Sequence, residues 1–125
     1  MRNTINIFQH KGKVTSMTVT VTYWDKLGED DFLSIDVPML HIKTFAKNLE
    51  DIEKSISESI KLFVINATHF GNGVESELTD IGWIVTGRDE NSIQMEFGFD
   101  KSISIIEEIL ETGETIVETL ELEYV

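Results

Sequence analysis

The chain of 125 residues contains no cysteine, a single proline and far fewer basic than acidic side chains. The absence of cysteine excludes disulfide bonds, thiolate metal ligands and a cysteine nucleophile. No apolar run approaches the roughly 20 residues that span a bilayer, and the first residues lack the apolar stretch of a signal peptide. We therefore expect a soluble, cytoplasmic protein that does not bind membranes.

The composition is that of a folded domain. The chain has the length of one ordinary domain, which buries roughly two thirds of its unfolded surface. Hydrophobic residues make up 41% of the sequence and are spread throughout it, which favours a packed core over disorder. Because no repeat or linker divides the chain, a single domain over residues 1–125 is predicted.

Charge is distributed unevenly along the chain. Residues 1–88 contain twelve acidic and nine basic side chains, a net charge of −3. Residues 89–125 contain eleven acidic side chains and one basic side chain, Lys101, a net charge of −10. A surface of this kind repels phosphate and anionic lipid and attracts cationic partners. The first 88 residues thus form a near-neutral half, and residues 89–125 form an acidic strand–helix–strand extension.

Alternation of apolar and polar residues predicts several strands. It is clearest over residues 14–24, where Met17, Val19 and Val21 point one way and the intervening threonines point the other. Near residues 25–30 a turn rich in Gly and Asp predicts a hairpin. Further strands are predicted over residues 4–8, 32–37, 41–45, 83–86, 93–99 and 116–124.

Three- and four-residue spacing of apolar side chains predicts a long amphipathic helix over residues 49–66, with Asn48 as its N-cap. A short helix is expected over residues 74–81, closed by Gly82. Another is expected over residues 101–111, where a strand is the alternative.

Together these elements predict an α+β domain, a mainly antiparallel β-sheet with the long helix packed on one face and one or two short helices. Burial of Ile52, Ile56, Ile60 and Phe63 would contribute about 1.5–3 kcal/mol per side chain.

No pattern of catalytic or metal-binding residues is present. The consecutive acids at residues 29–31 would point to opposite faces of a strand and fit a solvated turn better than a magnesium site. His10, His41 and His69 lie far apart and have no ligand-pair spacing. Residues 71–73 resemble half of a phosphate loop, but no Lys-Ser/Thr follows them. We predict no catalytic, cofactor-binding or metal residue and a protein that is not an enzyme.

Direct nucleic-acid binding is also not expected. Lysines occur singly along the sequence, whereas phosphate binding requires several on one face. Trp24, Phe32 and Trp83 could stack on bases, but in a small sheet we expect them to be core residues.

The acidic side chains after Arg88 fall on predicted strands and a predicted helix, so they would form an ordered anionic surface. A solvated face that keeps the protein soluble is the simpler explanation. Carboxylates side by side on one strand face repel one another unless a cation approaches, which favours a cationic protein partner. The predicted partner-binding residues are Glu107, Glu108, Glu111, Glu118, Glu121 and Glu123.

Residues 17–64 carry a hairpin, then Val37-Pro38-Met39-Leu40-His41, then a helix entry at residues 45–53 and the helix itself. This segment resembles the partial ribonuclease-H-like domain of HicB antitoxins. The usual Pro-Gly-Cys/Val is replaced by residues 41–43, and the acidic extension stands where such antitoxins carry a DNA-binding domain. The resemblance implies a protein that binds and masks a small basic ribonuclease toxin without binding an operator. It carries over no catalytic residue.

Three functions follow from the sequence. The leading hypothesis is a non-enzymatic, HicB-like antitoxin or regulator that binds a cationic protein through an acidic surface. The first alternative is a small-molecule binder or enzyme with a cleft near Trp24, His41 and Trp83. The second is an inhibitor from a phage or mobile element that imitates nucleic acid. Exposed sheet edges would also allow a homodimer through strand pairing. Whether residues 89–125 pack on the first sheet or project from it is left open.

Overall fold

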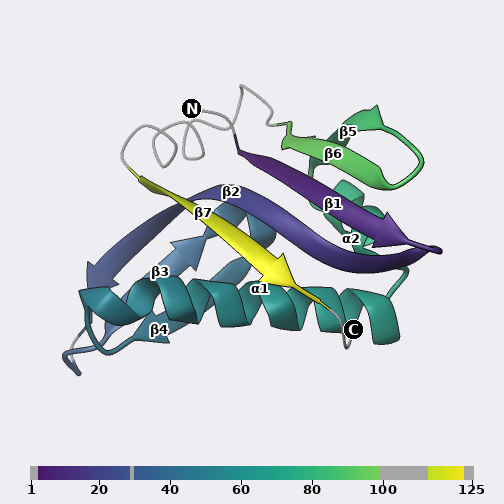
Figure 1. The fold of residues 1–125 in the computed structure, drawn as a ribbon. Helices are drawn as coiled ribbons and strands as arrows, with labels where there is room; N and C mark the ends of the chain where they lie inside the picture. The colour runs from purple at the N-terminus through teal and green to yellow at the C-terminus, as the bar shows by residue number, and fades with distance from the viewer. Residues whose placement is uncertain (1–2, 29, 99–112, 123–125) are drawn as a thin grey trace.

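The computed structural model describes residues 3–28, 30–98 and 113–122 (Figure 1). Its elements confirm the predicted α+β class: a seven-stranded antiparallel sheet with one long and one short helix. In chain order they are β1 (Thr4–His10), β2 (Lys13–Leu27), β3 (Leu33–Val37), the 3-10 turn η1 (Pro38–Leu40), β4 (Ile42–Ala46), the 3-10 turn η2 (Leu49–Asp51), α1 (Ile52–His69), α2 (Val74–Asp80), β5 (Trp83–Arg88), β6 (Ser92–Phe97) and β7 (Glu114–Glu121).

The sheet is organised around β2, which is 15 residues long. The strand order is β4-β3-β2-β1-β6-β5, and β7 pairs with β2 outside this path. Because of its length, β2 pairs with β1 over residues 13–20, with β7 over residues 16–23 and with β3 over residues 24–27, so β1 and β7 flank the same central stretch. The acidic extension is therefore part of the same sheet wherever it is described, since β6 pairs with β1 and β7 pairs with β2.

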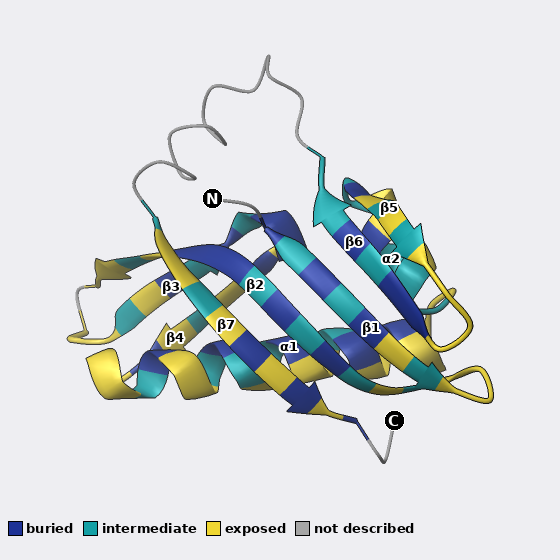
Figure 2. Cartoon of the chain, turned by 45° about the horizontal axis from the view of Figure 1, so that its top comes forward, coloured by how far each residue is buried: buried dark blue, intermediate teal, exposed yellow. Residues whose placement is uncertain are grey.

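Both helices pack on one face of the sheet, here called the inner face, as Figure 2 shows. Helix α1 contacts β4 and β7, and α2 contacts β5 and α1. The buried residues of α1 recur every three or four positions and meet the inward residues of the strands. They are Ile52, Ile56, Ile60, Val64 and Ala67. The opposite, outer face of β2 carries threonines, as the alternation predicted.

The predicted start of the long helix is confirmed at Asn48, whose side-chain oxygen accepts a hydrogen bond of 3.1 Å from the backbone N–H of Asp51. The first turn is the 3-10 turn η2, and α1 continues to His69, beyond the predicted residue 66. The glycine expected to close α2 is also confirmed. Gly82 has φ +108°, and a Cβ there would lie 3.2 Å from the ring of Phe97.

Several boundaries differ from the prediction for local reasons. Strand β4 begins at Ile42 because His41 adopts a left-handed conformation, with φ 53°, and closes the turn started by Pro38. Strand β5 extends to Arg88 because a bulge lets its pairing with β6 continue past Val85. The predicted helix over residues 101–111 lies outside the described residues. No helix in the described part of the chain is long and apolar enough to cross a bilayer.

Candidate partner-binding surfaces

The six carboxylates predicted to contact a partner divide into three groups. Glu107, Glu108, Glu111 and Glu123 lie outside the described residues. Glu121 lies exposed on the outer face of β7. Glu118 lies on the inner face and is only 7% exposed, so it does not belong to a solvated surface with Glu121. The burial of Glu118 and the exposure of Glu121 could have been predicted from the sequence, because alternation places Glu118 on the same strand face as the apolar Leu120 and Leu122.

Glu118 is a carboxylate held between β7 and α1. Its cross-strand neighbour on β2 is Val19, which is fully buried. Among the described residues its Oε1 atom has no hydrogen-bond partner. Burial raises the pKa of Glu118 to about 7, and the nearby carboxylate of Glu53 on α1 adds to the rise, whereas Lys61 opposes it. At neutral pH this carboxyl group therefore exchanges between its neutral and charged forms.

A second carboxylate of β7 is also bound to the sheet. The Tyr23 hydroxyl donates a hydrogen bond of 2.8 Å to Glu114. Burial, followed by the contact with Glu114, raises the pKa of Tyr23 to about 12, so the phenol stays protonated and remains a donor. Glu114 and Glu121 of β7 and Glu53 of α1 are thus exposed at one margin of the molecule, around the buried Glu118, and these four residues are called the acidic edge.

The backbone of β7 is itself part of this margin. Strand β7 pairs with β2 on one side, and its other side has no strand partner among the described residues. Figure 2 shows β7 at the margin of the sheet, above α1. Unpaired backbone groups on an edge strand are a template for pairing with another chain. The acidic edge therefore offers both charge and main-chain hydrogen-bonding groups.

A second exposed region, the apolar tip, consists of the large side chains Leu27, Phe32, Phe45 and Leu49. Two open hollows of about 450 and 330 Å³ adjoin these residues and share Lys47 in their lining. Exposed apolar clusters of this kind mark interaction sites. The charges beside the hollows are mixed: Lys47 and Lys54 lie among Asp31, Glu50, Asp51 and Glu58. The tip therefore does not select a partner by charge.

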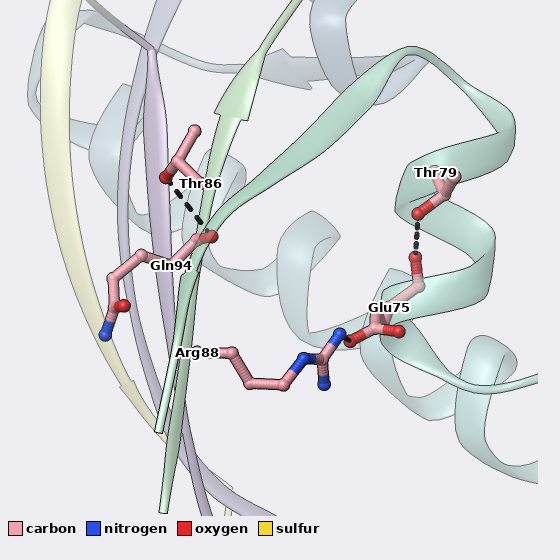
Figure 3. Close-up of polar contacts among 5 residues, drawn as sticks. All are labelled: Glu75, Thr79, Thr86, Arg88 and Gln94. Carbon is pink, nitrogen blue, oxygen red and sulfur yellow. Dashed lines mark hydrogen bonds and ion pairs between the residues drawn. The ribbon is translucent and has the colours of Figure 1, made fainter.

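A further hollow, of about 400 Å³, lies where α2 faces the turn between β1 and β2. Two of its lining residues, Arg88 and Glu75, form an ion pair across it (Figure 3). The carbonyl of Glu75 accepts a hydrogen bond of 2.9 Å from the hydroxyl of Thr79, four residues further along α2. The Arg88 guanidinium is thus paired within the chain, and Lys13 is the other basic side chain in the lining of this hollow.

In the described part of the chain, the residues of the predicted cleft, Trp24, His41 and Trp83, do not line a common hollow among those described above. Trp83 is a core residue on the inner face, and its indole N–H donates a hydrogen bond of 2.8 Å to the carbonyl of Met39. Trp24 lies on the outer face and is 50% exposed, and Phe32 is also exposed, so the prediction that these two are core residues is wrong. None of the hollows described above is lined by Trp24, His41 or Trp83.

No group of three or more histidine, aspartate or glutamate side chains in the described part of the chain is arranged to hold a metal ion. No family model, curated protein or solved structure matches this chain. The resemblance of residues 17–64 to HicB antitoxins therefore stays a prediction.

Proposed function

We propose that this protein is a non-enzymatic binding protein that holds a cationic protein partner at its acidic edge. The observation that carries the proposal is the meeting of carboxylates from two elements, Glu53 of α1 and Glu118 of β7, beside a strand edge that no other described strand pairs with. Glu114 and Glu121 extend the same charge along β7.

Electrostatics supports a cationic rather than an anionic partner. The chain carries a net charge of −13. This charge attracts cations within the Debye length, which is about 8 Å at physiological ionic strength. Lys61 is the cation that lies beside Glu118, and its effect on the Glu118 pKa is smaller than that of Glu53. A homodimer through β7 is disfavoured by the same charges, since it would bring two acidic edges together.

The resemblance to HicB antitoxins suggests which cationic protein this is. In that case the partner is a small basic ribonuclease toxin, and the protein acts in the cytoplasm by masking the toxin without binding DNA itself.

Co-purification from the native host at low salt, followed by titration of the isolated partner, tests the proposal. We expect affinity to fall steeply with salt. A variant with Glu53→Gln, Glu114→Gln and Glu121→Gln should bind at least tenfold more weakly and with a shallower salt dependence. The matched control neutralises three exposed acids elsewhere: Asp30→Asn, Asp80→Asn and Glu90→Gln.

The control separates local from overall charge. Equal weakening in both triple variants would mean that net charge alone acts, and a complex insensitive to salt would contradict an electrostatic interface.

A further inference from the structure

Glu118 points to a more specific form of this interaction. We infer that the cationic partner adds an extended strand along β7 and places an arginine or lysine beside the Oε1 atom of Glu118. This inference rests on the proposed function and specifies the partner's backbone conformation and one of its side chains.

Strand addition follows from the position of Glu118 on an edge strand. Side chains directly opposite one another on paired strands have Cβ atoms about 4.5–5.5 Å apart and point to the same face. A partner residue opposite Glu118 would therefore point to the inner face, into the space between β7 and α1. Arginine and lysine have stems long enough to lie along apolar surface while the charged head reaches a carboxylate.

The residues that flank Glu118 define the rest of the pattern. Ile116 is partly buried and Leu120 is fully buried, and both lie on the same face as Glu118. Partner residues two positions before and after the cation would lie opposite these side chains and should be apolar. The predicted recognition sequence is apolar-x-Arg/Lys-x-apolar in an extended segment.

The charges around Glu118 leave a place for this cation. From α1, Glu53 and Lys61 face the carboxylate; from β2, the facing residue is the apolar Val19. With both carboxylates ionised, the three charged groups sum to −1, and Oε1 has no partner among the described residues. A buried carboxylate oxygen without a partner is costly, so an added cation is favourable.

A proton and the partner's cation therefore compete for the same group. In the free protein a proton stabilises Glu118, whose pKa is about 7. Binding of the cation favours the ionised form and releases that proton. Affinity should consequently rise with pH up to about 7, by at most about tenfold per pH unit.

Isothermal titration calorimetry tests the inference with a short synthetic peptide, Thr-Val-Thr-Arg-Thr-Val-Thr, which places one arginine between two valines on the same strand face and is called here the valine–arginine peptide. Measurement in two buffers of different ionisation enthalpy gives the number of protons released. We expect up to one proton for the wild type near neutral pH and none for Glu118→Gln, together with roughly ten- to a hundredfold weaker binding. Glu121→Gln, on the outer face of the same strand, is the matched control and should keep the proton release.

Two altered peptides separate the components of the inference. Citrulline in place of arginine removes the charge and should weaken binding. N-methylation of alternate peptide bonds removes main-chain pairing and should also weaken it.

Equal binding of the N-methylated peptide, or unchanged proton release in Glu118→Gln, would overturn strand addition at Glu118 while leaving the salt-dependent partner of the proposed function intact. Failure of the wild type to bind the valine–arginine peptide would also overturn it. Thermal unfolding checks that Glu118→Gln is folded. Glu53→Gln provides a second variant, because losing the Glu53 charge should lower the Glu118 pKa and reduce proton release.

Discussion

The indole N–H of Trp83, at the start of β5, donates a hydrogen bond of 2.8 Å to the main-chain carbonyl of Met39 in η1. Both side chains are almost fully buried. This bond joins the turn that follows β3 to β5, which is the last strand at the other end of the sheet. It also gives a hydrogen-bond donor to a buried main-chain carbonyl.

Replacing Trp83 by phenylalanine should therefore destabilise the protein by about 2–4 kcal/mol, because it leaves the Met39 carbonyl without its donor and creates a small void. Urea denaturation measures the change. The control is Trp24→Phe, at the half-exposed tryptophan of β2, which should change the free energy of unfolding by about 0.5 kcal/mol or less. Equal effects of the two substitutions would contradict the assigned burial.

The inner side of α1 should not tolerate charge. Ile56 is completely buried against the sheet, so Ile56→Asp should cost roughly 4 kcal/mol or more and remove the cooperative melting transition. Leu62 is on the same helix and is 56% exposed, so Leu62→Asp should leave the transition nearly unchanged. Circular dichroism during heating distinguishes the two, and a normal transition for Ile56→Asp would show that the helix is not packed as described.

The prediction for Ile56 could be made from sequence because its spacing relative to Ile52 and Ile60 has the period of a helix. The hairpin of β2 and β3 was equally accessible, since the turn at residues 25–30 is rich in Gly and Asp and period-two alternation sets which flanking residues face inward. The pairing of β7 with β2 could not be predicted from the sequence. It joins residues far apart in the chain, such as Val19 and Glu118, so no local sequence pattern indicates it.

The candidate site was only partly predictable for the same reason. The acidic character of β7 was visible in the composition, but the approach of Glu53 to Glu118 depends on how α1 crosses the sheet. The exposure of Trp24 and Phe32 was mispredicted because aromatic residues in a small sheet are usually buried, whereas here Trp24 on the outer face and Phe32, just before β3, are left uncovered.

Glu118 should make stability fall as pH rises. Its pKa is 4.5 in the unfolded chain and about 7 in the folded protein, so the folded state binds more protons between these values. The destabilisation develops from about pH 4.5 to 7 and reaches roughly 3 kcal/mol at most. Glu118→Gln should abolish this contribution. Denaturation of both proteins at about pH 5 and about pH 8 measures it, and an identical pH dependence in the two would contradict the burial of a titrating carboxyl group.

Asp89 should act in the opposite direction at lower pH. Its carboxylate accepts hydrogen bonds of 2.9 Å from the backbone N–H of Asn91, the backbone N–H of Ser92 and the Ser92 hydroxyl. These bonds, led by the one from Asn91, hold the pKa of Asp89 below its usual 3.8. The stabilisation is present above that value and is lost as pH falls through the lower folded pKa.

Asp89→Ala should lower the melting temperature at neutral pH, because the turn between β5 and β6 loses all three acceptor contacts. Asp89→Asn keeps an acceptor oxygen and should retain part of the stability. Scanning calorimetry compares the three proteins; an alanine variant as stable as the wild type would mean that the backbone alone determines this turn.

The pairing of β7 with β2 also determines when the sheet can close during synthesis on the ribosome. A ribosome releases β2 long before β7, so Met17, Val19 and Val21 lack one flanking strand until residues 114–121 have emerged. Such long-range closure slows folding relative to helical proteins, and it leaves the nascent chain with a strand edge on β2 that chaperones could bind. The edge on β7 exists only after closure. A partner that recognises β7 would therefore distinguish molecules in which β7 has paired with β2 from those in which it has not.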